Sequence, residues 1–292
     1  MAILDGPDVR TVDTTMGGVR VRDTGGSGPP LLLIHSLLVD PDLYATLQPL
    51  LTARGYRCIV PELPLGAHRV PARRGADLSP PGLANVLAEV LDAVGVARAS
   101  VVGVDTGGAL AQLLMARHRE RVDAVILTAC DAYEDFPPRS LVGMLFRPLF
   151  WPGALALVAH AARLALVRRL LVPRPITHRG VGDETLIRWT SPLRHRAVRR
   201  DLQAVLREMH PRHTLSAAAA NRDFPRPVLI AWGDDDRLFP RRIAERLARD
   251  IPRARTATLA DCAAFAAIDQ PEALAALICG HLASTEARAV AL

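Results

Sequence analysis

Short apolar runs alternate with helical stretches through most of this 292-residue chain. The runs at 31–35, 56–60, 100–104 and 122–130 are mostly apolar and rich in Val, Leu and Ile, as strands buried on both faces are. Helical patterns separate them. Strand, helix and strand repeated in this way predict a mostly parallel sheet with helices on both faces, so the expected fold class is α/β.

The alternation stops after Phe136 and resumes at 227–232. Between Pro137 and Arg222 the pattern is helical, with 15 arginines against four acids, a net charge of about +11, whereas the rest of the chain carries about −5. We therefore expect a core domain of residues 1–136 and 223–292, interrupted by a helical, Arg-rich cap at 137–222. The apolar cap helices could instead lie on a membrane surface, but a cap that closes over a cleft needs the same amphipathic pattern.

The composition limits the partners and sites that we expect. The sequence has no window of about 18 apolar residues and no basic-then-apolar leader, which predicts a cytoplasmic protein without stable membrane insertion. Every basic side chain is Arg, as a GC-rich genome would give, so the net charge of +6 does not indicate nucleic-acid binding and none is expected. The four cysteines form no CxxC pair, so we expect neither a zinc cluster nor a disulfide framework.

The stretch VVGVDTGGALAQ, residues 101–112, places Asp105 at the corner between a buried strand and a helix. Gly103-Val104-Asp105-Thr106-Gly107 fits the G-x-nucleophile-x-G elbow, a strained turn that lifts one side chain above the edge of the sheet. The two glycines are required because a Cβ there would strike the neighbouring strand or helix. The helix N-terminus would favour the charged form of Asp105. The simpler alternative is an aspartate that caps a tight loop.

With this elbow, the chain resembles the α/β-hydrolase family along nearly its whole length. The segments that carry the resemblance are LLLIHSLLVDPDLY (31–44), like the first catalytic loop, PELPLGAH (61–68), like the D-x-P-G-x-G loop, and FAAIDQPE (265–272), like the end of the histidine loop. WGDDDRLFP (232–240) matches the segment that carries the family's catalytic acid, which implies that role for Asp236. The resemblance implies the α/β-hydrolase fold with a helical cap.

An aspartate at the elbow narrows the implied chemistry. A carboxylate suits acyl transfer poorly, but it can attack a saturated carbon that bears a halide or a strained oxygen, giving an ester that water later cleaves. Haloalkane dehalogenases, fluoroacetate dehalogenases and epoxide hydrolases of the family share this usage. The resemblance implies Asp105 as the nucleophile and the backbone N–H groups of Leu37 and Thr106 as the oxyanion hole. It also implies a small organic substrate, which could be anionic, and neither a cofactor nor a metal.

The family's histidine base is missing from its usual place. Seven residues before Pro271 the sequence has Ala264. The side chains that hold the leaving group in the three named activities are incomplete as well, so we endorse none of them. His68, which closes the loop that borders the pocket in this fold, is the candidate replacement for the base. His35 and Trp189 are candidate substrate-binding residues, although His35 fits an anchor for the neighbouring backbone better.

Three functions remain open at this point. In the first, Asp105 attacks a small substrate and the general base is non-standard or missing. In the second, Asp105 is an acid–base group in an elimination, isomerisation or cyclisation, which needs no ester-cleaving water. In the third, the protein is a catalytically inactive relative that binds a ligand beneath the cap. An imidazole within reach of Asp105 separates the first function from the second, and the sequence does not predict an oligomeric state.

Overall fold

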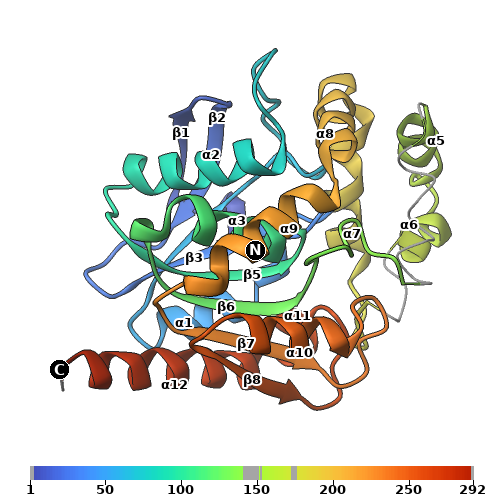
Figure 1. Cartoon of the computed structure of the whole chain (residues 1–292). Helices are drawn as coiled ribbons and strands as arrows, with labels where there is room; N and C mark the ends of the chain where they lie inside the picture. The colour runs from blue at the N-terminus through green and yellow to red at the C-terminus, as the bar shows by residue number, and fades with distance from the viewer. Residues whose placement is uncertain (1–2, 141–150, 152, 172–175, 291–292) are drawn as a thin grey trace.

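The structure is a computed structural model that describes residues 3–140, 151, 153–171 and 176–290, with the side chains of 169–171 and 285–290 excepted. Its described strands form one sheet in the order β1-β2-β4-β3-β5-β6-β7-β8, parallel from β4 onwards (Figure 1). The strands are β1 (Val9–Thr14), β2 (Gly17–Asp23), β3 (Pro30–Ile34), β4 (Arg57–Pro61), β5 (Ala99–Asp105), β6 (Val122–Cys130), β7 (Val228–Gly233) and β8 (Ala254–Leu259). This sheet confirms the predicted α/β class.

The two strands at the start of the chain form the antiparallel edge of the sheet. β1 and β2 form a hairpin, with Val12 opposite Val19, and β2 pairs antiparallel with β4. In the parallel part, the register places Val102 of β5 opposite Leu33 of β3 on one side and Ile126 of β6 on the other. The carboxyl ends of β5, β6 and β7 therefore lie next to one another at one edge, where ligand sites of open α/β sheets form.

Helices follow most strands, as the sequence predicts. The core helices are α1 (Leu47–Thr52), α2 (Pro80–Ala93), α3 (Thr106–Arg117), α10 (Arg241–Asp250), α11 (Ala266–Asp269) and α12 (Pro271–Val290). Helix α2 begins as its sequence indicates, because the Ser79 hydroxyl accepts the Gly82 N–H and Pro80 occupies the first turn. In Figure 1, α2 and α3 lie above the sheet and α1 and α12 below it.

One predicted helix is wrong in detail. The sequence predicts a single helix over 41–53, but the chain forms a short 3₁₀ turn, η2 (Pro41–Tyr44), and then the separate helix α1. Proline lacks the N–H that the helix interior needs, so Pro49 is tolerated only in the first turn. This restricts α1 to a start close to Leu47.

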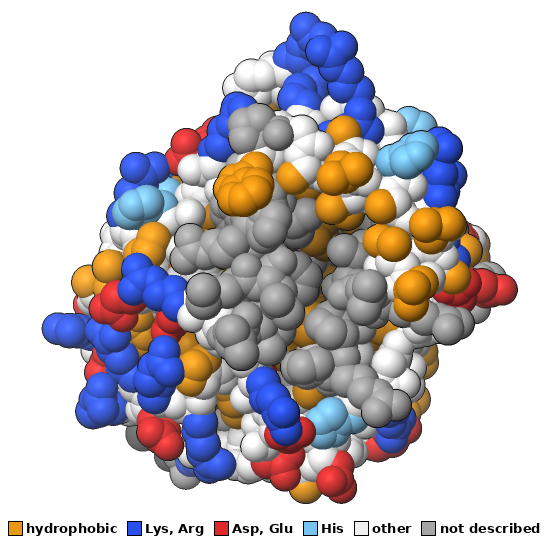
Figure 2. Space-filling view, turned by 90° about the vertical axis from the view of Figure 1, so that its right-hand side faces the viewer, with side chains coloured by type: hydrophobic (Ala, Val, Ile, Leu, Met, Phe, Trp, Pro, Cys, Tyr) orange, Lys and Arg blue, Asp and Glu red, His pale blue; other side chains and the backbone are white. Residues whose placement is uncertain are grey.

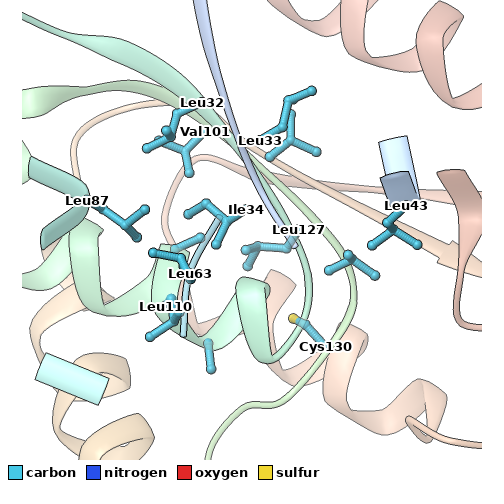
Figure 3. Close-up of a cluster of buried hydrophobic side chains, with 14 of the residues drawn as sticks. Leu32, Leu33, Ile34, Leu43, Leu63, Leu87, Val101, Leu110, Leu127 and Cys130 are labelled. Carbon is cyan, nitrogen blue, oxygen red and sulfur yellow. The ribbon is translucent and has the colours of Figure 1, made fainter. Parts of the chain in front are cut away.

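The hydrophobic core follows the central strands. Leu31, Leu32, Leu33 and Ile34 of β3 are fully buried, as expected for a parallel strand covered on both faces. Figure 3 shows Leu32, Leu33 and Ile34 gathered with residues of the neighbouring strands and of the covering helices, among them Val101, Leu127, Leu87 and Leu110. Burial of one such side chain stabilises the fold by about 1.5–3 kcal/mol. The packed strands hold the edge that carries Asp105 in place.

Helices also fill the segment between β6 and β7. They are α5 (Ala154–Ala161), α6 (Ala165–Leu171), α7 (Asp183–Thr190), α8 (Arg196–Glu208) and α9 (Pro211–Ala220). Helix α9 packs against α3, and the Thr214 hydroxyl donates to the Tyr133 carbonyl at 2.6 Å. The cap at 137–222 stays a prediction, and these contacts favour grouping α9 with the core. Within the described residues, no helix has both the length and the apolar character needed to cross a bilayer.

Candidate functional site

Asp105 stands on a sharp turn between β5 and α3. Its backbone has φ 52° and ψ −125°, a conformation that non-glycine residues rarely adopt and that costs about 1–3 kcal/mol. The side chain is partly exposed, whereas Val104 and Thr106 on either side are buried. The turn therefore raises Asp105 above the sheet edge, as the elbow motif predicts.

The two glycines of the motif make this turn possible. A Cβ on Gly103 would lie 2.5 Å from the carbonyl oxygen of Gly107, and a Cβ on Gly107 would lie 2.6 Å from the carbonyl oxygen of His35. Real Cβ atoms do not approach backbone oxygens so closely. The predicted steric reason for both glycines is confirmed.

Two hydroxyl groups contact the Asp105 carboxyl. The Ser36 hydroxyl donates to Oδ2 at 2.5 Å, and the Thr106 hydroxyl lies 3.4 Å from Oδ1. Burial nevertheless raises the pKa of Asp105, although the Ser36 hydroxyl and the Thr106 N–H lower it in part. The expectation that the helix N-terminus keeps Asp105 charged is thus offset, because the loss of water costs the carboxylate more than these donors return.

A second carboxyl group, Asp131, lies beside Asp105 at the end of β6. It is fully buried and its Oδ2 lies 3.3 Å from the Thr106 hydroxyl. The Thr106 hydroxyl therefore lies between the two carboxyl groups, and burial together with the charge of Asp105 raises the pKa of Asp131 well above its usual range. No described group donates to its buried Oδ1. A proton on Asp131 accounts for both observations, because two ionised carboxylates held this close together repel each other.

A third carboxyl group, Asp236, follows β7. Its Oδ1 accepts the N–H groups of Leu238 at 2.8 Å and Phe239 at 3.0 Å. Its Oδ2 is buried and has no hydrogen-bond partner among the described residues. Burial, together with the negative charge of Asp105, raises the pKa of Asp236 to about 7. The ends of three neighbouring strands therefore carry three carboxyl groups, which we call the carboxyl cluster (Asp105, Asp131 and Asp236).

All nine histidines belong to the part of the chain that the structure describes, and none of them forms a hydrogen bond with the carboxyl cluster. Ala264 is buried in the loop after β8. The neighbouring Cys262 is buried too, and burial raises the pKa of its thiol to about 12, so it is not a thiolate at neutral pH. Asp105 thus lacks the imidazole partner that a hydrolase triad uses.

His68, the predicted replacement for the base, is buried against helix α8. Its Nδ1 accepts the Gly66 N–H at 3.3 Å, so Nε2 carries the proton and donates to Asp201 Oδ2 at 3.3 Å. Asp201 also accepts the Ala72 N–H at 2.8 Å. Both nitrogens of His68 are therefore occupied by contacts that join the loop after β4 to α8.

His35 holds two segments of backbone together. Its Nδ1 donates to the Ser36 carbonyl and its Nε2 accepts the Leu63 N–H, both at 2.9 Å. The ring is fully buried, and burial lowers its pKa to about 4, which keeps it neutral. These contacts fit the anchoring role.

Trp189 of α7 connects this helix to the loop after β3. Its indole N–H donates to Asp40 Oδ1 at 2.7 Å, and the neighbouring Arg188 pairs with Asp42 Oδ2 at 2.7 Å. Asp42 Oδ1 also accepts the Ile3 N–H at 2.5 Å. Burial raises the pKa of Asp40 to about 7. The polar atom of Trp189 is therefore used within the protein.

The predicted oxyanion-hole residues, Leu37 and Thr106, follow β3 and β5, which pair in the sheet. The Thr106 N–H lowers the pKa of the Asp105 carboxyl. Leu38 next to Leu37 has φ 59°, and its N–H is taken by the Leu65 carbonyl at 2.7 Å. Among the described residues, no group of three His, Cys, Asp or Glu side chains could hold a metal ion.

Our sequence reasoning did not identify Asp131 and Ser36 as site residues. Asp131 directly follows a predicted strand, as Asp105 does, and acids that follow neighbouring parallel strands meet at one edge. That signal could have found Asp131. Ser36 could have been found only with the strand order, because β3 lies between β4 and β5 in the sheet.

Comparisons with known proteins agree with the fold. The model of the alpha/beta hydrolase family matches residues 31–277. The chain is 26% identical over 289 residues to haloalkane dehalogenase 2 of Mycobacterium bovis, covering 92% of this chain and 93% of that protein. It is 30% identical over 206 residues to 2-hydroxymuconate semialdehyde hydrolase of Pseudomonas putida, covering 68% and 67%.

Solved structures share the fold. A loop variant of the haloalkane dehalogenase DbeA from Bradyrhizobium elkanii superposes with a TM-score of 0.81 at 22% identity, covering 96% of this chain and 98% of that one. A meta-cleavage product hydrolase superposes with a TM-score of 0.76 at 19% identity, covering 96% and 100%.

Proposed function

Because the chain belongs to the alpha/beta hydrolase family, we propose that it is an enzyme that converts a small organic molecule through Asp105. In this proposal Asp105 transfers a proton and does not form a covalent bond, so the reaction is an isomerisation, an elimination or a cyclisation. One observation carries the proposal: the Asp105 carboxyl lies beside a second carboxyl, Asp131, with the Thr106 hydroxyl between them, and it bonds to no imidazole among the nine histidines.

The carboxyl cluster suits proton transfer for a physical reason. General acid–base catalysis is most efficient when the pKa of the group lies near the working pH. Burial raises the pKa values of all three carboxyls toward that range, to about 7 for Asp236. In an isomerisation the ionised Asp105 removes a proton from one atom of the substrate and returns it to another, so no net proton is needed. The protonated Asp131 stabilises the ionised form of Asp105 by donating to it.

Covalent attack by Asp105, the reaction first expected from the resemblance, is a second candidate. The strained elbow and the 26% identity to a haloalkane dehalogenase favour it. Attack on a carbon that bears a halide would form the alkyl ester and release the halide ion. Hydrolysis of this ester would then lack the general base, whose loss costs about 10²–10⁴ in rate. The ester would therefore accumulate.

The remaining predicted residues take supporting roles in this proposal. Leu37 and Thr106 supply N–H groups to a developing negative charge on the substrate. His68, His35 and Trp189 position the walls of the site, since their nitrogens are bound to Asp201, to the Ser36 and Leu63 backbone, and to Asp40.

Solvent exchange tests the proton transfer directly. A panel of small ketones and lactones is incubated in D₂O, and loss of the C–H proton is followed by NMR. We expect the wild-type protein to catalyse exchange and Asp105→Asn to lower the exchange rate by about 10²-fold or more. Circular dichroism checks that the variant is folded. Exchange that is unchanged in Asp105→Asn, after deamidation has been excluded by mass spectrometry, would refute the role of Asp105.

Intact mass spectrometry separates the two candidates. The protein is incubated with small haloalkanes or epoxides, and an adduct is mapped by peptide digestion. A stable adduct on Asp105 that Asp105→Asn does not form supports covalent attack and contradicts the proton-transfer proposal. If no compound of the panel shows exchange or forms an adduct, the result favours a catalytically inactive relative that only binds a ligand.

A further inference from the structure

A basic groove lies outside the site of Asp105, between the loop that precedes α2 and helix α8. Its volume is about 1240 Å³. We define the basic groove by the six arginines that line it, Arg73, Arg74, Arg196, Arg199, Arg200 and Arg207. Ala72 in the loop bonds to Asp201 and Arg200 of α8, so the two walls are joined at their base. The loop and α8 rise at the top of Figure 1, and Figure 2 shows basic side chains gathered at the top of the molecule.

The charge of the groove is largely uncompensated. Arg74, Arg196 and Arg207 are exposed and form no ion pair or side-chain hydrogen bond within the described part of the chain. Among the described residues, the guanidinium group of Arg199 donates hydrogen bonds only to the carbonyls of Leu193 and Arg194, at 2.6 and 2.8 Å.

The acids near the groove are mostly engaged elsewhere. Asp201 is buried and already accepts from His68, Ala72 and Arg200. Asp13 faces Arg73 at 3.6 Å, and both side chains are largely exposed, so this pair contributes little. At the Arg207 end, Glu208 pairs with Arg212 at 2.8 Å, which leaves Asp77 as the nearest acid in the adjoining hollow.

The arginines on and beside helix α10, in contrast, are paired with acids. The pairs on or beside α10 are Arg241–Glu245, Arg242–Asp135, Arg246–Glu134 and Arg249–Asp250. Like charges held together without counter-charges repel one another and destabilise the fold, so their retention in one groove requires a compensating gain. Binding of an anion supplies that gain, because guanidinium groups form strong, charge-assisted bonds to phosphate oxygens.

We propose that the basic groove binds a small organic molecule that carries two or more phosphate groups. The uncompensated arginines of α8, at 196 and 207, are eleven residues apart, about 16 Å along a helix. Arg74 faces them from the loop. A molecule with several linked phosphates can reach more than one of these positions, which a single phosphate cannot. No aromatic side chain is among the described lining residues, and single-stranded nucleic acids bind chiefly where bases stack on aromatic rings.

Tripolyphosphate is the probe for this groove, and isothermal titration calorimetry gives its affinity. The test variant is Arg74→Gln/Arg196→Gln/Arg207→Gln. The matched control is Arg163→Gln/Arg222→Gln/Arg255→Gln, which removes the same charge from three exposed arginines that line no part of the groove. We expect the groove variant to bind at least about 100-fold more weakly than wild type and the control to bind within about threefold.

Two results overturn the proposal. An equal loss in both variants means that tripolyphosphate responds only to net charge. A single-stranded oligonucleotide is titrated at the same concentration of phosphate groups. If it binds more tightly than tripolyphosphate does, the groove is assigned to nucleic acid instead. Denaturant unfolding of both variants checks that neither loss arises from misfolding. Because the readout is binding, failure here leaves the proposed reaction at Asp105 untouched.

Discussion

The replacement Asp236→Asn tests the reasoning behind the carboxyl cluster. Burial raises the pKa of Asp236 from the ordinary 3.8 to about 7, so the folded chain holds a proton that the unfolded chain releases. The contribution of this group to stability is fully present below pH 3.8 and is lost as the pH rises toward 7. Asparagine cannot ionise, but its carbonyl can still accept the N–H groups of Leu238 and Phe239.

The magnitude follows from linkage. One pKa unit corresponds to about 1.4 kcal/mol, so the penalty from Asp236 is about 1 kcal/mol at pH 4.5 and about 4 kcal/mol at pH 7. The wild-type protein should therefore lose about 3 kcal/mol relative to Asp236→Asn over this interval. The side-chain NH₂ of the new asparagine has no partner, but the cost of burying it is the same at pH 4.5 and at pH 7. It therefore does not change the expected difference between the two pH values.

Urea unfolding at pH 4.5, 5.5 and 7 measures the effect, and the fluorescence of the buried Trp232 reports on the region. Asp13→Asn on the exposed face of β1 is the control for the loss of an acid as such. Parallel stability profiles of wild type and Asp236→Asn would show that Asp236 is already ionised at pH 4.5. In that case burial does not raise the pKa of Asp236, and the carboxyl cluster loses the physical basis for an acid–base role.

Three further substitutions test the framework of the site. Gly107→Ala places a Cβ 2.6 Å from the His35 carbonyl oxygen and should lower the free energy of unfolding in urea by at least about 3 kcal/mol. The control Gly182→Ala has open space around it and should change this free energy little. Equal effects of the two substitutions would contradict the elbow geometry. Trp189→Phe removes the bond to buried Asp40 and should cost about 1–3 kcal/mol, and an equal loss in the exposed control Trp151→Phe would argue against that bond. His68→Ala should lower stability by a similar amount but leave deuterium exchange intact; abolished exchange in a folded variant would make His68 the base.

Most of the fold could be predicted from local patterns. Continuously apolar runs such as 122–130 are typical of buried parallel strands, and the observed strand Val122–Cys130 has the same bounds. The elbow was predictable because the steric need for Gly103 and Gly107 depends only on a tight turn from strand to helix. The end of helix α12 was less predictable, since the residues after His281 give no strong stop signal and the helix continues to Val290.

The site could be predicted only in part. The role of Asp105 as the raised residue follows from the motif, but its neighbours depend on strand order and on loop conformation. The contact between Trp189 and Asp40 joins residues 149 positions apart, and no local pattern encodes such a pairing. The raised pKa of Asp105 could not be predicted from the sequence either, because the cost of burying its charge depends on the whole surrounding structure.

The bonds that hold α7 to the loop after β3 restrict the movement of this helix. Trp189 and Arg188 supply donors to Asp40 and Asp42, and the Ile3 backbone shares Asp42. Outward movement of α7 would leave these carboxyls without their donors, at about 1–3 kcal/mol for each buried group. Helix α7 is therefore held in place by its partners in the loop after β3, and redesign of this region should keep these two aspartates.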